Sequence, residues 1–498
     1  MLEYIKNESN KTYTENGAVT NVSTLSDCLD LFACIGALRY QSDEEVIRKF
    51  VRGFTENKDM AMKILFFARD VREGLGERHV FRTIISWLAE DEPQSVKRNI
   101  GFVAEYGRWD DLLCLMDTEC RDDALACIKA QLDADIKAAV SGGSVSLLAK
   151  WLPSVNASNP DTIREAKRLA RLLGMKDAEY RKTLSWLRGK IKILENNLRE
   201  KDYTFSYDKQ PSAAMLKYHS AFIRNDEERY MGFLESVRAG RVKMNTGTLA
   251  PYQLVAPFLR FSNWTEETPT FMKSDLSAAE LSALNTTWGA LPDYCGDRNC
   301  LAIVDTSGSM FWESAPMPAD VAMSLGLYFA ERNKGMFHDH FITFSEKPQL
   351  ISIKGETFAD KLRYICSFCE IGDTNIEAVF DLILKAAVAH HADQSDLPEQ
   401  LVIISDMEFN WCAVDAEKSN FDHAKETFAA QGYRLPQLVF WNVSSRNRQQ
   451  PVTMNEEGVI LISGCTPKIF EMVSAGAVSP YEFMLDTINS KRYAKIAA

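Results

Sequence analysis

The stretch that decides the fold is CLAIVDTSGSM, residues 300–310. Its first five residues are an unbroken apolar run, and Asp305, Ser307 and Ser309 follow directly. A short apolar run that ends in small polar residues predicts a strand buried on both faces, as in a parallel sheet. In open α/β sheets, ligands bind beyond the carboxyl ends of such strands. The polar residues after Val304 are therefore candidate binding residues.

Apolar runs and helical segments alternate along the chain from about residue 291. The apolar runs predict further strands at 341–344, 401–405, 438–442 and 459–462. Periodic segments between them predict helices at 319–333, 358–368, 376–390 and 421–431. This alternation is typical of a largely parallel, doubly wound sheet with helices on both faces. We therefore predict an α/β domain over residues 291–498.

Two further polar positions stand where this domain would bind a ligand. Asp406 follows the strand at 401–405, and Thr374 precedes the helix that begins near Ile376. This order of residues resembles the metal-ion-dependent adhesion site of von Willebrand factor A-type domains. That motif combines an Asp-x-Ser-x-Ser run with a distant Thr and a distant Asp. The resemblance implies a metal site formed by Asp305, Ser307, Ser309, Thr374 and Asp406.

The chemistry of these side chains fits Mg²⁺ or another divalent cation, because hard oxygen ligands favour such ions. An open coordination position could accept a carboxylate of a partner protein, or a phosphate. The alternative is a domain that keeps the fold, but in which the ion is only structural or the site is unoccupied. A hydrolase that uses the same site is disfavoured, because no general base accompanies the hydroxyl groups. Asp373 is the nearest candidate base and is more simply a loop residue.

The first half of the chain has the helical period instead. From about residue 24 to residue 284, apolar residues recur at three- and four-residue spacing. Many amphipathic helices joined by short polar loops predict an all-α, helical-repeat (HEAT-like) region over residues 24–290. Residues 1–23 are expected to be a flexible N-terminus. Two charged stretches, RDVREGLGER at 69–78 and YGRWDD at 106–111, are interpreted as inter-helix turns with paired charges.

Charge is distributed unevenly along this half. The whole chain has a formal charge of −12, yet residues 161–250 carry 19 Lys and Arg against 12 Asp and Glu. Such a block could attract phosphates, and nearby aromatic rings could stack on unpaired bases. Charge alone equally fits solvated helix faces. The candidate RNA contacts are Arg181, Lys182, Arg188, Lys190, Lys192, Lys209, Lys217, His219, Arg224, Arg241 and Lys243.

A helical region followed by an A-type domain resembles the architecture of the Ro autoantigen (TROVE) family. In that family, helical repeats form a ring closed by the A-type domain, and basic surfaces of the ring bind small noncoding RNAs and misfolded RNA ends. The resemblance implies a non-enzymatic protein that binds small noncoding or single-stranded RNA. The stretches DKQPS at 208–212 and KWLP at 150–153 resemble more closely a domain-of-unknown-function family with the same two-part layout.

Composition excludes several other classes of protein. The 498 residues are 46% hydrophobic and 25% charged, which is the balance of a multidomain globular chain. No apolar stretch is long enough to span a bilayer, so we expect no membrane partner. The eleven cysteines are odd in number and lie in apolar segments, which indicates buried thiols in a reducing cytoplasm. No phosphate loop of a P-loop ATPase occurs.

Two functions therefore remain open from the sequence. The first is RNA binding through the basic helical region, with a Mg²⁺-dependent ligand site in the A-type domain. The second is a metal-dependent protein–protein interaction scaffold without nucleic acid, in which an acidic residue of a partner binds the metal site.

Overall fold

The computed structural model describes residues 1–191, 193–259, 276–312, 314–369, 374–409, 419–446, 449–473 and 479–498. Two compact units make up the chain. Unit 1 comprises Met1–Asn57 and Tyr207–Ser490. Unit 2 comprises Lys58–Ser206 and Lys491–Ala498. Each unit is therefore assembled from segments that lie far apart in the sequence.

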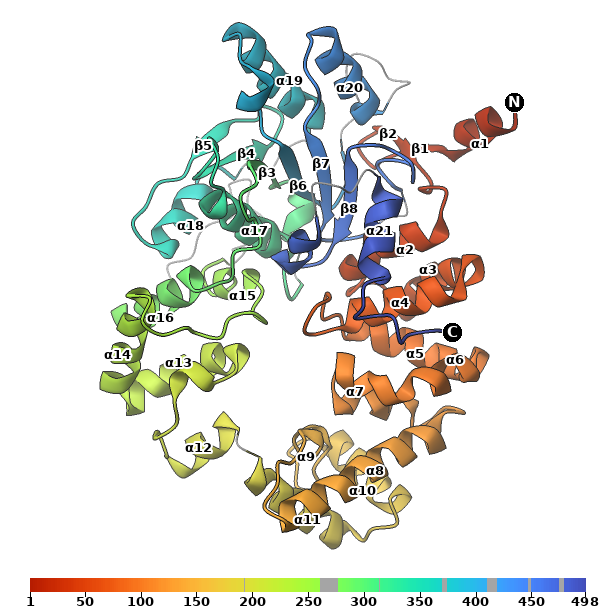
Figure 1. Ribbon diagram of the computed structural model, residues 1–498, viewed down its shortest axis with the longest axis vertical. Coiled ribbons are helices and arrows are strands. Elements are labelled where there is room, and N and C mark those ends of the chain that lie inside the picture. The colour runs from red at the N-terminus through yellow and green to blue at the C-terminus, as the bar shows by residue number, and fades with distance from the viewer. Residues whose placement is uncertain are drawn as a thin grey trace. The chain divides into compact units, whose positions relative to one another are not determined.

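Unit 1 contains a six-stranded sheet with the strand order β5-β4-β3-β6-β7-β8 (Figure 1). Neighbouring strands are parallel, except that the edge strand β5 pairs antiparallel with β4. The five predicted strands are confirmed, whereas β5 was not predicted, because it has three residues and only one of them is buried. The bounds are β3 Cys300–Asp305, β4 His340–Phe344, β5 Leu350–Ser352, β6 Gln400–Ser405, β7 Gln437–Asn442 and β8 Val459–Ser463.

Helices cover both faces of this sheet, and the four predicted in this domain are confirmed within two residues at each end. One face packs against α19 and α20, and their apolar residues share a core with alternate residues of the strands, such as Ile303 and Ile403. The opposite face receives α17, where Gly326 lies so close to Val304 that a Cβ would come within 2.3 Å of it. The helices are α17 Pro318–Arg332, α18 Phe358–Cys366, α19 Ile376–Ala389, α20 Asn420–Ala430 and α21 Pro480–Ile488.

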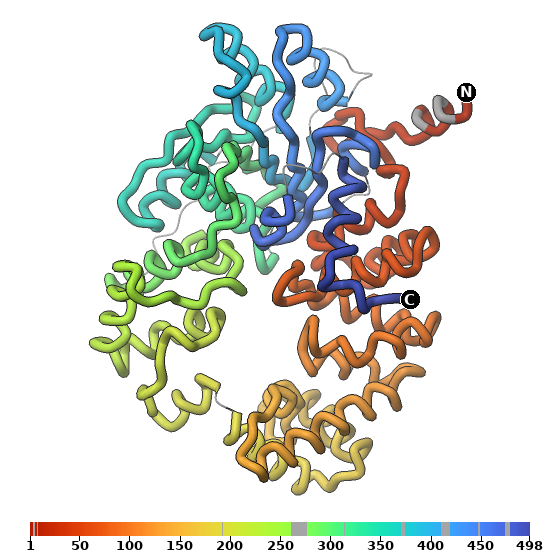
Figure 2. The backbone as a smooth tube through the Cα atoms, in the orientation of Figure 1, coloured from red at the N-terminus to blue at the C-terminus, as the bar shows by residue number. Residues whose placement is uncertain are grey.

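The N-terminal segment, for which the sequence predicts flexibility over residues 1–23, forms a helix and a hairpin in unit 1. Helix α1 (Leu2–Asn10) leads into a hairpin of β1 (Lys11–Tyr13) and β2 (Val19–Asn21). The backbones of Asn21 and Gln450 exchange two hydrogen bonds, and Ala18 is buried in the core of the sheet. Figure 2 shows this N-terminal hairpin beside the C-terminal strands. Contacts such as that of Thr20 with Gln450, across 430 positions, leave no local sequence signal.

The domain boundary predicted near residue 290 lies inside unit 1. Several helices from the predicted helical region belong to unit 1 with the sheet. One of them, α16, stacks Trp288 on Phe358 of α18 with ring centroids 4.5 Å apart. These helices are α2 Asp27–Cys34, α3 Asp43–Glu56, α13 Ser212–Asn225, α14 Glu227–Arg238, α15 Tyr252–Val255 and α16 Ala278–Gly289.

Unit 2 is helical, as predicted for this part of the chain. It also contains the last eight residues, Lys491–Ala498, which pack on its first helices. Arg492 forms two hydrogen bonds to the carboxylate of Asp70, and Tyr493 donates a third at 3.1 Å. The helices are α4 Lys58–Arg69, α5 His79–Asp91, α6 Pro93–Asn99, α7 Val103–Tyr106, α8 Arg121–Val140, α9 Leu148–Trp151, α10 Pro160–Leu172, α11 Asp177–Lys190 and α12 Leu194–Glu200.

The two charged stretches of unit 2 form buried ion pairs, which confirms their interpretation as paired charges. Arg69 is 1% exposed and its Nε donates to Oδ2 of the fully buried Asp111 at 2.8 Å. Arg82 donates to the other oxygen of Asp111 at 2.7 Å. A Cβ on Gly107 would come within 2.3 Å of the same carboxylate. Both stretches therefore hold helices together.

Among the described residues, no helix is both long and apolar enough to cross a bilayer.

We expect Asp111→Ala to lower the free energy of unfolding by about 3–5 kcal/mol, because it leaves the Arg69 guanidinium buried without its carboxylate. The matched change is Lys58→Ala, which removes an exposed ion pair with Glu92 in the same unit and should cost at most about 1 kcal/mol. Equilibrium urea unfolding measures both. Equal losses would contradict the assignment of Asp111 to the core of unit 2.

Candidate functional site

Asp305 and Asp406 meet at the carboxyl edge of the sheet. Asp305 is the last residue of β3, and Asp406 directly follows β6. These strands are parallel neighbours, with Val304 opposite Ile404. Their carboxyl ends therefore lie side by side.

Hydrogen bonds join four of the five predicted metal ligands into one group. The backbone N–H of Ser307 donates to Oδ1 of Asp305 at 2.8 Å. The hydroxyls of Ser307 and Ser309 lie 3.0 Å apart, and the hydroxyl of Ser309 donates to Asp406. Ser405, between the two strand ends, donates to Oδ2 of Asp305 at 2.5 Å. The Asp-x-Ser-x-Ser run thus folds around the two carboxylates.

Thr374, the fifth predicted ligand, contacts the loop that follows Asp406. Its side chain is buried, and Oγ1 donates to the backbone oxygen of Glu408 at 2.7 Å. Asp373, considered above as a base, lies outside the described residues.

Three carboxylates are buried at this site. The side chains of Asp305, Asp406 and Glu408 are at most 3% exposed. Burial raises the pKa of Asp305, and the nearby charge of Asp406 raises it further. Burial also raises the pKa of Asp406, whereas Arg446 opposes that rise. Among the described residues, Arg446 is bonded to Asp406, with Nη2 at 2.9 Å from Oδ2.

These residues fit a divalent cation. Two carboxylates and three hydroxyls supply only hard oxygen donors, and an ion would neutralise charge on the buried, adjacent carboxylates of Asp305 and Asp406. The described residues contain no group of three or more His, Cys, Asp or Glu side chains arranged for a metal. The candidate set is of another kind, because hydroxyls provide most of its ligands. Asp305, Ser307, Ser309, Thr374 and Asp406 would hold the ion.

Sequence reasoning missed three parts of this site. Arg446 follows β7, so the strand-end argument that selected Asp406 could have selected it as well. Glu408 lies two residues beyond Asp406 in the same loop. The turn of the N-terminal hairpin also reaches the site, where Nδ2 of Asn16 donates to the backbone oxygen of Glu408 at 2.8 Å. No sequence signal pointed to the hairpin, because its partners are about 390 residues away.

The predicted RNA contacts fall into two groups. Four described members belong to unit 2, namely Arg181, Lys182, Arg188 and Lys190, and six belong to unit 1, namely Lys209, Lys217, His219, Arg224, Arg241 and Lys243. All except Arg188 and His219 are exposed. Lys192 lies outside the described residues. The sequence block is therefore divided between the two compact units.

Two of these residues bond to the protein's own backbone. Nε of Arg188 donates to the backbone oxygen of Ala149 at 2.7 Å, and Nη2 donates to that of Leu152 at 2.8 Å. The Nδ1 atom of His219 is 2.6 Å from the backbone oxygen of Leu216. Arg188 thus holds the segment after α9 against α11, which is a positioning role.

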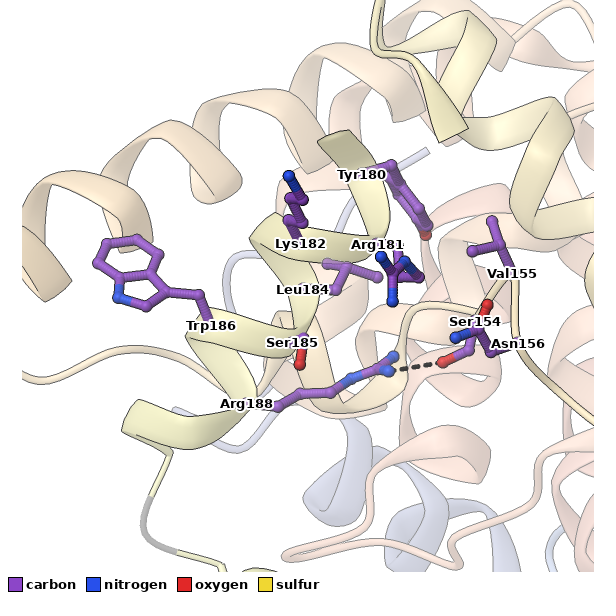
Figure 3. A pocket seen from close by; sticks show the side chains of 10 residues that line it. All are labelled: Ser154, Val155, Asn156, Tyr180, Arg181, Lys182, Leu184, Ser185, Trp186 and Arg188. Atoms are coloured by element: carbon purple, nitrogen blue, oxygen red, sulfur yellow. Dashed lines mark hydrogen bonds between the residues drawn. The ribbon is translucent and has the colours of Figure 1, made fainter. Parts of the chain in front are cut away.

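A cavity of about 420 Å³ opens along α11 in unit 2. Arg181, Lys182, Trp186 and Arg188 line it from the helix, and Ser154 and its neighbours line it from the loop after α9. In Figure 3, Arg181 and Arg188 point toward that loop, whereas Trp186 projects from the other side of the helix. Trp186 is 39% exposed to solvent. At this cavity α11 therefore carries exposed cations and, on another side of the helix, an exposed ring.

Two families of unknown function match the sequence. Residues 14–131 and 156–294, more than half of the chain, match the family described as "Domain of unknown function (DUF2828)". The chain belongs to the DUF2828 family. Residues 299–485 of this DUF2828 protein also match "Domain of unknown function (DUF7788)".

Two individual proteins are similar over nearly the whole DUF2828 protein. "Uncharacterized protein L728" of Acanthamoeba polyphaga mimivirus is 28% identical over 522 residues, which cover 96% of this chain and 87% of the relative. The crystal structure of the Deinococcus radiodurans RO (RSR) protein matches with a TM-score of 0.47 at 14% identity, and covers 93% of this chain and 99% of that chain.

A further carboxyl group, that of Asp320 in the first turn of α17, is buried and should make the stability of the protein depend on pH. Its side chain is 6% exposed, and burial raises its pKa to about 7, although a hydrogen bond from the backbone of Met317 opposes the rise. Below about pH 4 the group is protonated in the folded and the unfolded chain. Between about pH 4 and pH 7 the unfolded chain loses this proton first, so Asp320 lowers the stability progressively.

Asp320→Asn should therefore stabilise the protein at pH 8, by about 4 kcal/mol at most, because the neutral amide avoids the buried charge. The gain should shrink as the pH falls and vanish near pH 4. Urea unfolding at both values, with wild type and variant side by side, measures the difference. A gain that does not depend on pH would contradict the raised pKa.

Proposed function

We propose that this DUF2828 protein is a non-enzymatic RNA-binding protein and that the cavity along α11 is one of its contacts with unpaired RNA. The cavity is the observation that supports this function best. Arg181 and Lys182 are exposed there and would attract phosphates, and the exposed indole of Trp186 offers a face on which a base can stack.

The cavity favours a single strand over a duplex. Stacking requires a base whose face is open, and bases in a duplex are covered by their neighbours. Trp186 is the ring available for such stacking at α11, because Tyr180 is buried and donates its hydroxyl proton to the backbone oxygen of Pro153 at 3.0 Å. The proposed ligand is therefore a small noncoding or misfolded RNA with an unpaired segment.

Arg181→Glu/Lys182→Glu should weaken the binding of a labelled single-stranded RNA about tenfold or more at low salt. The slope of log K against log salt should also fall by about 1.4, because two phosphate contacts are lost. Trp186→Ala should weaken binding by about 1–3 kcal/mol without changing that slope. Fluorescence anisotropy across a series of salt concentrations measures all three quantities. Arg188 is left intact because it holds the loop after α9.

The control is Lys129→Glu/Lys137→Glu, which makes the same change in charge on exposed residues of α8 outside the cavity. If both pairs weaken binding equally, the RNA responds to overall charge and the placement at α11 is wrong. If the wild type binds no RNA, the function itself is refuted. RNA crosslinked to the native protein and then sequenced would identify the ligand.

The adjacent buried carboxylates of Asp305 and Asp406 at the sheet edge support a second function. We propose that the strand-end site binds Mg²⁺ or another divalent cation and presents it to an acidic group of a partner protein. The ion would supply a fixed positive charge that a carboxylate can bind. A protein with this site could act as a metal-dependent protein–protein interaction scaffold even if it bound no nucleic acid.

Mg²⁺ should raise the melting temperature of the wild type by about 2–4 °C at ten times its dissociation constant, because it binds the folded chain only. Asp305→Asn should abolish this shift, since it removes a charged ligand. Asp320→Asn provides the matched control, because it neutralises a carboxyl group that is also buried with a raised pKa but lies outside the site. Differential scanning calorimetry with and without Mg²⁺ separates the two. A normal shift in folded Asp305→Asn would refute the ligand assignment.

A further inference from the structure

The turn of the N-terminal hairpin, residues 14–18, lies directly on the candidate cation site of unit 1. Three side chains or backbone groups of this turn bond to the loop after Asp406. Oγ1 of Thr14 donates to the backbone oxygen of Phe409 at 2.5 Å. The N–H of Glu15 donates to Oε2 of Glu408 at 2.9 Å, and Nδ2 of Asn16 donates to the backbone oxygen of Glu408 at 2.8 Å.

Asn16 also reaches one of the proposed cation ligands. Because a backbone carbonyl can only accept, the bond to Glu408 places the NH₂ group of the amide at the site. The same nitrogen lies 3.4 Å from Oγ1 of Thr374. The hydroxyl of Thr374 donates its own proton to the oxygen of Glu408, so Oγ1 offers lone pairs to Asn16. A cation would bind through lone pairs of this same oxygen.

Arg446 bonds to a second proposed cation ligand, Asp406, and also contacts the turn. Nη2 of Arg446 donates to Oδ2 of Asp406 at 2.9 Å and lies 3.4 Å from Oε2 of Glu15. The turn therefore holds Asn16 directly over Thr374, and through Glu15 it contacts the guanidinium that neutralises Asp406. Side-chain nitrogens of Asn16 and Arg446 therefore contact oxygen atoms that we propose as ligands of the cation.

We propose that the turn 14–18 and Arg446 form an internal cap that competes with the divalent cation for Thr374 and Asp406. This inference rests on the proposed cation site. With the cap closed, Asn16 and Arg446 partly satisfy the buried oxygens without an ion. Cation binding requires these donors to leave, so the ion and the closed cap exclude one another. The hairpin stays attached through Asn21 and Gln450 while the turn opens.

The cap would couple the affinity of the site for the cation to opening of the turn. Opening the turn exposes the loop of Glu408 and separates Glu15 from Arg446, which frees the guanidinium for an anionic group of a partner. Any partner that binds the open turn would raise the cation affinity, and the cation would raise the affinity for that partner by the same factor.

The test measures Mn²⁺ binding to the full-length protein by isothermal titration calorimetry. Asn16→Ala should tighten binding by about 3- to 10-fold, the equivalent of one hydrogen bond that the ion no longer has to displace. Arg446→Gln should tighten it further, because it also removes a positive charge beside the ion. The double variant should gain less than the product of the single effects, since both changes open the same cap.

The matched control is Asn21→Ala, which removes a side-chain hydrogen bond from the hairpin to Gln450 and touches no proposed ligand. Mg²⁺ should also speed amide hydrogen exchange at Glu15 and Ala18, whose N–H groups are bonded in the closed turn. Equal tightening by Asn21→Ala, or no change in either site variant while the wild type binds Mn²⁺, would overturn the cap alone. No Mn²⁺ binding by the wild type or by any variant would overturn both the cap and the cation site. Binding in the variants but not in the wild type would support the cap.

Discussion

Burial of negative charge at the ends of two parallel strands is the constraint on which unit 1 depends. The parallel register of β3 and β6 places Asp305 and Asp406 beside one another in a water-poor position. Ionised carboxylates are costly there unless donors or a cation surround them. The neighbouring hydroxyls, Arg446 and the N-terminal hairpin can all be understood as responses to this charge. At the same place, a turn from the start of the chain bonds to the loop after Asp406, more than 390 residues later.

Unit 2 deals with buried charge in a different way. Asp111 is fully buried, yet two guanidinium groups bond to it, and Asp70 is matched by Arg492. These carboxylates are compensated within the protein, and a cation has no role there. At the strand-end site of unit 1, Asp305 and Asp406 are buried side by side, and the guanidinium of Arg446 bonds to Asp406. Charge balance, rather than burial alone, therefore separates a structural ion pair from a candidate ligand site.

The basic block shows why charge in a sequence is a weak guide to a binding surface. Arg188 and His219 both belong to it, but they bond to backbone oxygens of their own unit. The remaining described cations are exposed and are distributed over two units. The cavity along α11 has exposed cations and an exposed indole ring among its lining residues. It is this combination, and not the net charge, that supports an RNA contact.

The sequence by itself determined the elements whose signals are local. Apolar runs predicted the central strands, and helical periodicity predicted the helices. Polar residues at the ends of predicted strands indicated the candidate ligands Asp305, Ser307, Ser309 and Asp406. A three-residue edge strand was too short to be recognised. Only the tertiary structure decided that residues 11–21 dock on the sheet, that Arg446 neutralises Asp406, and that the last eight residues complete unit 2. These features depend on pairs of residues that are hundreds of positions apart, and neither member of a pair carries a local pattern that names the other.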